Sequence, residues 1–132
     1  MSARFLLDTS VCVDILRQRV PSAGLPPAGE CCLSTIVTAE LRAGLAKAPS
    51  AVRERKLEDF IGLFPVRDFD EGAARHYGEI RADLERSGTS IGPLDLLIAA
   101  HARSSGASLV TGNVREFRRV KGLELTVWKS RS

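Results

Sequence analysis

The sequence is poor in aromatic residues and in cysteine, and both shortages exclude classes of protein. Aromatic residues make up 5% of the 132 residues, which argues against a surface that holds nucleic acid mainly by base stacking. The three cysteines, Cys12, Cys31 and Cys32, are odd in number and form no C-x-x-C pair. The sequence therefore indicates neither a disulfide framework nor a zinc knuckle, and we expect buried thiols in a reducing compartment.

Long apolar runs are also missing. No stretch is long enough to span a membrane, and the run Phe5–Leu7 is too short for a signal peptide and ends at Asp8. We therefore expect a cytoplasmic protein with no membrane contact. The hydrophobic share of 44% and the charged share of 27% are ordinary globular values. The length fits a single domain over residues 1–132.

The motifs of several other α/β classes are absent. A nucleotide-binding domain needs a glycine-rich turn after its first strand or a G-K-[ST] loop, and neither occurs. A phosphoacceptor domain needs a second acid two residues after Asp8, where this chain has Ser10. A nucleophilic hydrolase pairs Ser or Cys with His, but there is no G-x-S-x-G, and we expect His76 and His101 to be structural.

The sequence does contain short apolar runs that alternate with helical patterns. This alternation predicts a parallel sheet with helices on both faces. The expected strands are Phe5–Leu7, Cys31–Leu33, Leu63–Val66, Ser108–Val110 and Leu123–Trp128. The expected helices begin after Asp8 and cover Val37–Ala46, Ser50–Ile61, Glu71–Arg86 and Leu94–Ala102, and a loop is expected at Pro21–Gly29.

Three carboxylates occupy positions where an acid is costly. Asp8 ends the first strand, where it either caps the next helix or is left free by a nearby serine that caps instead. Glu40 shares the spacing of Ile36 and Gly44 on a predicted apolar stripe, unless it reaches water from the margin of that stripe. Asp95 lies in the first turn of the most apolar helix, where the helix dipole is a weak reason for a charge.

These acids are expected to meet, because ligands of open α/β sheets bind at the carboxyl ends of the strands. Converging carboxylates repel one another unless a cation compensates, and ligands that are all oxygen select Mg²⁺ or Mn²⁺. Such a cluster supports metal-assisted displacement at phosphorus. Asn113 follows the strand Ser108–Val110, where it either supplies an oxygen to this cluster or caps a turn.

The sequence resembles the PIN-domain toxins of the VapC type. The similarity spans nearly the whole chain in the order of the family's motifs, and the last two of four segments are the most distinctive. The four segments are Leu6–Ser10, Ser34–Gly44, Ile91–Ala102 and Leu109–Val120.

The resemblance implies a three-layer α/β/α fold with a parallel sheet of four to five strands. It implies the toxin of a type II toxin–antitoxin system, an endoribonuclease that uses Mg²⁺ or Mn²⁺ to cut structured RNA such as transfer or ribosomal RNA. It also implies a homodimer and a VapB-like antitoxin whose carboxyl-terminal segment blocks the active-site groove.

The acidic positions of the family fall on Asp8, Glu40 and Asp95, which the resemblance makes both catalytic residues and metal ligands. The fourth catalytic position falls on Asn113, where many members of the family have Asp. A catalytically silent PIN domain that binds RNA or a protein is the main alternative, and a DNA-cutting relative is another.

Five further residues are expected to support the site or its substrate. The resemblance places Thr9 and Thr111 where hydroxyls support the acids. The net charge of +3 and the pI of about 9.0 suit an anionic partner. We therefore expect Arg115, Arg118 and Arg119 to contact the RNA backbone, although such a charged cluster is also common on an ordinary solvated surface.

Overall fold

The computed structural model describes residues 3–17 and 25–128, and these form a five-stranded parallel sheet with helices around it. The strands are β1 (Phe5–Leu7), β2 (Cys31–Ser34), β3 (Val66–Arg67), β4 (Ser108–Thr111) and β5 (Leu125–Val127). The helices are α1 (Thr9–Leu16), α2 (Thr35–Lys47), α3 (Ala51–Ile61), α4 (Glu71–Ser87), α5 (Pro93–Ser105) and α6 (Val114–Phe117), with a 3₁₀ turn at Ala28–Glu30.

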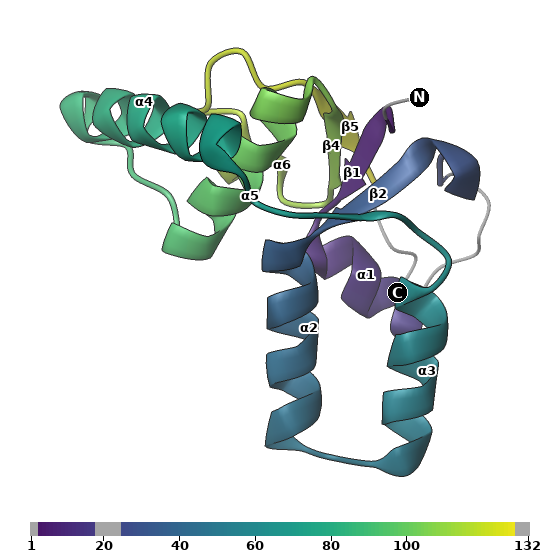
Figure 1. Ribbon diagram of the computed structural model, residues 1–132. Coiled ribbons are helices and arrows are strands. Elements are labelled where there is room, and N and C mark those ends of the chain that lie inside the picture. The colour runs from purple at the N-terminus through teal and green to yellow at the C-terminus, as the bar shows by residue number, and fades with distance from the viewer. Residues whose placement is uncertain (1–2, 18–24, 129–132) are drawn as a thin grey trace.

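The strand order β3-β2-β1-β4-β5 explains the layers. The chain moves from β1 outwards to β3, then crosses to β4 on the other side of β1. Because crossovers between parallel strands are right-handed, this reversal places α1, α2 and α3 on one face and α4, α5 and α6 on the other (Figure 1). The predicted three-layer α/β/α architecture is confirmed. The reversal lies between β1 and β4, the switch point where ligands of such sheets bind.

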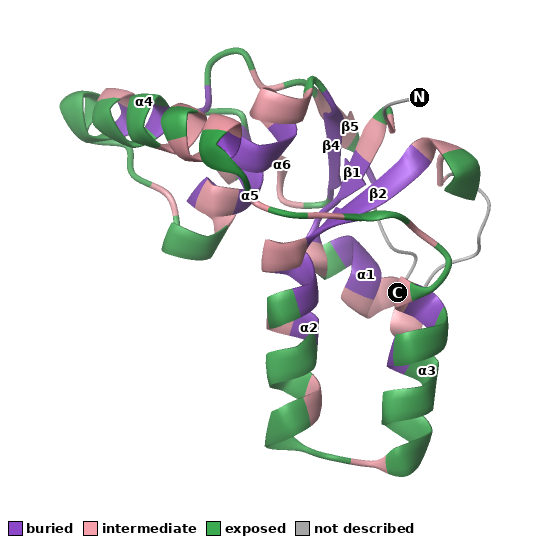
Figure 2. Ribbon diagram, in the orientation of Figure 1, coloured by how far each residue is buried: buried purple, intermediate pink, exposed green. Residues whose placement is uncertain are grey.

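The core runs through the three central strands, which Figure 2 shows as almost entirely buried. Leu6 on β1 pairs in register with Cys32 on β2 and Leu109 on β4, and all three are 1% exposed or less. Cys12 and Cys31 are also buried, and all three cysteines are free, as predicted. Central strands that are covered on both faces read as continuous apolar runs, which is why the sequence revealed them.

Four helices begin at a residue whose side chain accepts a backbone hydrogen bond. Asp8 caps α1, Ser34 caps α2, Ser50 caps α3 and Asp70 caps α4. These caps satisfy amides that have no partner inside a helix, so they fix where each helix starts. Ser34 starts α2 at Thr35, two residues before the predicted start.

The third strand differs from its prediction. Leu63 and Phe64 continue the turns that end α3, and the strand is Val66–Arg67 rather than Leu63–Val66. Pro65 has no N–H to donate to the sheet, and only its carbonyl takes part, accepting from the Leu33 amide at 2.9 Å. In the predicted loop Pro21–Gly29, residues 21–24 lie outside the described residues. The remainder runs into the 3₁₀ turn.

Two glycines shape the chain around β4. Gly106 ends α5 with a left-handed φ of 69°, a conformation that favours glycine. At Gly112, directly after β4, an added Cβ would lie 3.0 Å from the carbonyl oxygen of Trp128. Glycine at this position therefore lets the end of β5 approach the turn that leads to Asn113.

Replacement of Phe117 tests how the core supports α6. Phe117 is fully buried, so Phe117→Ala should lower the free energy of unfolding by about 3–5 kcal/mol, as measured by urea denaturation. Val52→Ala is the control, because Val52 is 66% exposed and its truncation should change stability by less than about 0.5 kcal/mol. A loss below about 1 kcal/mol for Phe117→Ala would contradict this account of the core.

Candidate active site

Asp8 lies at the carboxyl end of β1 and is only 4% exposed. Its amide extends the sheet by donating to the Val110 carbonyl at 2.9 Å. The carboxylate accepts three hydrogen bonds, from the Thr9 amide at 2.8 Å, Ser10 Oγ at 3.0 Å and Thr111 Oγ1 at 2.7 Å. Asp8 is therefore itself the cap of α1, and Ser10 donates to it instead of replacing it. These three donors hold the carboxylate in one orientation.

Glu40 lies at the margin of the buried face of α2, not on it. The buried residues of this helix are Val37, Thr38 and Leu41, whereas Gly44 is exposed, so the predicted apolar stripe is wrong on that side. The half-buried Glu40 carboxylate turns toward α1, where Thr9 Oγ1 donates to its Oε1 at 2.6 Å. One hydroxyl of α1 therefore orients an acid that comes from a different helix.

Asp95 lies in the first turn of α5. The pKa of Asp95 is raised to about 6. Partial burial is the largest cause, and the negative charges of Asp8, Glu116 and Glu40 add to it. Repulsion of this kind requires the carboxylates to lie close together. The three predicted acids thus converge at the switch point between β1 and β4, as the strand order requires.

Sequence reasoning missed Glu116, which lies on the short helix α6 and is half-buried. It follows Asn113 by three residues, and residues at this spacing lie on one side of a helix. A prediction of α6 would therefore have placed Glu116 beside Asn113. Asn113 occupies the cap position of α6, but its side chain makes no capping hydrogen bond. Its amide donates to Thr111 Oγ1 at 2.9 Å, so Thr111 links Asn113 to Asp8.

The predicted RNA contacts divide into two kinds. Arg115, Arg118 and Arg119 are all exposed, but Arg119 also donates from Nη1 to the carbonyl oxygen of Ser90 at 3.2 Å. Arg119 thereby anchors the loop that leads into α5. Both histidines make hydrogen bonds away from the carboxylates: His76 Nδ1 accepts from an arginine of α5, and His101 Nδ1 lies 2.8 Å from Ser34 Oγ.

The donors at this site suit a hard divalent ion. Four carboxylates supply only oxygen, and the pKa of Asp95 is raised first by burial and then by the charges of the neighbouring acids. Among residues 3–17 and 25–128, no group of three His, Cys, Asp or Glu side chains could hold an ion together. Mg²⁺ does not require such a cage, because it is usually bound through one or two carboxylates and keeps several waters.

Comparison with known proteins decides the family. Residues 5–123 match the PIN domain. The chain is also 40% identical over 131 residues to the tRNA(fMet)-specific endonuclease VapC of Shigella flexneri, covering 95% of this chain and 98% of the relative. The chain belongs to the PIN-domain family of VapC toxin ribonucleases. In the described part of this VapC chain, no helix is long and apolar enough to cross a membrane.

Solved VapBC complexes share the fold of this VapC chain. The VapC fold in VapBC2 of Rickettsia felis, bound to a promoter DNA fragment, superimposes with a TM-score of 0.84 at 34% identity, covering 95% of this chain and 98% of that one. DNA-bound VapBC of Salmonella typhimurium gives a TM-score of 0.82 at 37% identity, covering 98% of this chain and all of that one.

The raised pKa of Asp95 predicts how stability depends on pH without metal. A protonated Asp95 stabilises the fold below its ordinary pKa of 3.8, and this contribution is lost as the pH rises through about 6. At pH 7, Asp95→Asn should therefore be more stable than the parent by about 1 kcal/mol, after discounting for partial exposure. The difference should vanish below about pH 4.

Urea denaturation in EDTA between pH 4 and 7 measures this effect. Asp59→Asn removes a charge from the exposed face of α3 and should not reproduce it. Parallel stability curves for Asp95→Asn and the parent would mean that neither burial nor the neighbouring acids raise the pKa of Asp95.

Proposed function

We propose that this VapC chain is a toxin that cuts structured RNA with the help of Mg²⁺ or Mn²⁺, and that transfer RNA is its substrate class. The convergence of Asp8, Glu40, Asp95 and Glu116 at one edge of the sheet carries the proposal. The name of the Shigella flexneri relative supports the substrate, because its 40% identity extends over nearly all of both chains.

Each acid has a role that follows from its contacts. Asp8 and Asp95 would hold the ion, because Asp8 is fixed by three donors and its charge acts on Asp95 at the start of α5. Such an ion promotes displacement at phosphorus by activating a water and offsetting charge on the phosphoryl oxygens. Glu40 binds Thr9 through Oε1, which leaves Oε2 to orient the attacking water. Asn113 and Glu116 would hold further water at the opposite side.

Exposed arginines beside the acids would guide the substrate. Arg115 and Arg118 flank Glu116 on α6 and its end, so they can neutralise phosphates next to the bond that is cut. Arg119 acts on the loop before α5 through Ser90, and its part in RNA binding is indirect.

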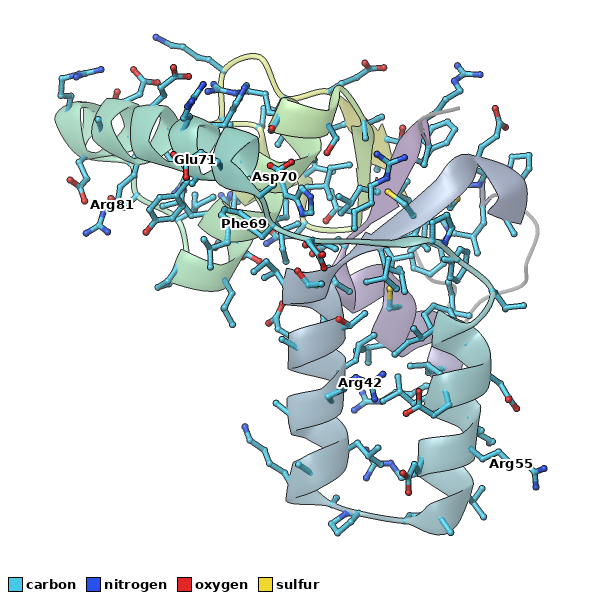
Figure 3. All side chains as sticks on the ribbon, viewed as in Figure 1. Arg42, Arg55, Phe69, Asp70, Glu71 and Arg81 are labelled. Carbon is cyan, nitrogen blue, oxygen red and sulfur yellow. The ribbon has the colours of Figure 1, made fainter. Side chains whose placement is uncertain are left out.

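We also propose that a VapB-like antitoxin binds the groove between α1, α2 and α3. This groove encloses about 220 Å³, and Glu40 lies on its lining together with apolar residues and three cations. An apolar segment bound here would therefore reach an active-site acid. Figure 3 shows Arg42 between α2 and α3, where it pairs with Glu58 at 2.8 Å and braces the two helices. The three cations that line the groove are Arg17, Arg53 and Lys56.

The homodimer implied by the family resemblance stays a prediction.

Cleavage of a transfer RNA pool tests the proposed chemistry. The antitoxin-free protein should give discrete fragments with Mg²⁺ or Mn²⁺ and none with EDTA. Asp8→Asn and Asp95→Asn should slow cleavage by at least about a hundredfold, because each removes a carboxylate from the ion site. Asp59→Asn loses the same charge elsewhere and should cut at the parental rate. Equal rates for all four proteins would refute the assignment, and no cleavage by the folded parent would favour a domain that only binds.

Charge reversal in the groove tests the antitoxin site. Arg53→Glu and Lys56→Glu should weaken inhibition by the antitoxin about tenfold or more, while RNA cleavage by the free toxin stays unchanged. Arg55→Glu is the matched control, since Figure 3 shows Arg55 pointing away from α2. Inhibition titrations of cleavage give the affinities. If Arg55→Glu weakens inhibition as much as Lys56→Glu does, the groove is not the site.

A further inference from the structure

A buried hydrogen bond joins the strand before α2 to the middle of α5. Ser34 Oγ and His101 Nδ1 lie 2.8 Å apart, although the two residues are 67 positions apart in the chain. Ser34 is 0% exposed and His101 is 3% exposed. Neither residue belongs to the carboxylate cluster, so the bond needs another explanation.

The direction of this bond follows from the partners of the serine. Ser34 Oγ already accepts from the Ile36 amide at 3.0 Å, as the cap of α2. In the described chain, His101 Nδ1 is the acceptor within reach of the Ser34 hydroxyl proton, which would otherwise be buried without a partner. The hydroxyl therefore donates to Nδ1, and the imidazole is neutral with its proton on Nε2. Burial lowers the pKa of His101, which favours the same neutral form.

The two ends of this bond adjoin the helices that carry two of the acids. Ser34 caps α2 and precedes Glu40 by six residues, and His101 follows Asp95 by six residues on α5. Glu40 is one of the charges that raise the pKa of Asp95, after burial, Asp8 and Glu116, so the two helices bring like charges near each other. Within residues 3–17 and 25–128, no other side-chain hydrogen bond joins β2 or α2 to α5.

The segment that follows β3 closes over this bond. Phe69 packs edge-on against the His101 ring, with the ring centres 5.6 Å apart. The Phe69 amide donates to Thr35 Oγ1 at 3.2 Å, so the same residue holds the first turn of α2. Figure 3 labels Phe69 and Asp70 on the stretch that crosses from α3 toward α4, beside the start of α2. This cover keeps water away from the bond and strengthens it.

We infer that Ser34 and His101 are positioning residues of the ribonuclease site, which set the spacing between the Glu40 helix and the Asp95 helix and so place Glu40 beside the divalent ion that Asp8 and Asp95 would hold. The inference rests on the proposed function, because it assigns the spacing to metal binding. Groups behind the ligands of a metal site often control its affinity in this way.

A pair of substitutions at His101 isolates the bond. His101→Asn keeps an oxygen near the place of Nδ1, whereas His101→Leu has a similar bulk but no acceptor. Both lose the ring contact with Phe69, so their difference reports the hydrogen bond. Adding Ser34→Ala to His101→Leu removes the unpartnered hydroxyl, and this relieves part of the stability loss without restoring the link.

Mn²⁺ binding, followed by electron paramagnetic resonance well below the unfolding temperature, is the first readout. His101→Leu should bind Mn²⁺ about tenfold more weakly than the parent, and His101→Asn should stay within about threefold. The double variant should remain as weak as His101→Leu even where its stability recovers. Cleavage should lose kcat with little change in KM. Parental Mn²⁺ affinity in folded His101→Leu would overturn the inference, as would equal losses in the Leu and Asn variants.

Hydrogen exchange of the Ile36 amide in the metal-free protein is the second readout. This amide should exchange about tenfold faster in His101→Leu than in His101→Asn, because its acceptor Ser34 Oγ loses its own anchor. If the parent binds no Mn²⁺ and cuts no RNA, the proposed function fails, and the inference fails with it whatever the exchange rates. If the parent binds Mn²⁺ but the exchange rates of the two variants are equal, the positioning role of the Ser34–His101 bond is wrong while the proposed function stands.

Discussion

Repulsion among carboxylates at the carboxyl end of the sheet is the constraint on which the rest of the structure depends. Asp8, Glu40, Asp95 and Glu116 come from four different elements and meet at the switch point, where partial burial and mutual charge raise the pKa of Asp95. Without constraints from the fold, these carboxylates would move apart or stay protonated. The fold holds Asp8 and Glu40 in place through hydrogen bonds, so a cation bound among the acids would relieve their repulsion.

The fixation uses hydroxyls rather than positive charges. Asp8 is held by Ser10 and Thr111, and Glu40 is held by Thr9, all at 3.0 Å or less. An arginine in these places would also orient the acids, but it would cancel the charge that attracts the ion. Hydroxyls orient without neutralising. None of the ion pairs in the described part of the chain involves one of the four acids, which agrees with this division.

The sequence predicted the parts of the site that follow strong local patterns. Asp8 and Asp95 were found because an acid interrupts a buried strand end and a nearly apolar helix. Glu116 was missed because α6 has four residues, too few for a helical period to show. Glu40 was predicted because it shares a helix face with Gly44 that was expected to be buried, but Gly44 is exposed. The hydrogen bond from Thr9 fixes Glu40 instead. Which helices lie beside each other depends on strand order, and a single sequence shows this only through resemblance to a family.

The position of Glu40 joins catalysis to inhibition. The same helix carries this acid toward α1 and forms one wall of the groove that α3 completes, so a segment in the groove would touch both the apolar wall and the active site. Under the proposed antitoxin site, an antitoxin bound there would stop the enzyme without unfolding it and without occupying the place of the ion. This arrangement requires α2 to keep its position, because a shift of α2 would displace Glu40 as well. The bond between Ser34 and His101 is buried at the first turn of α2, where a fixed pivot would serve both tasks.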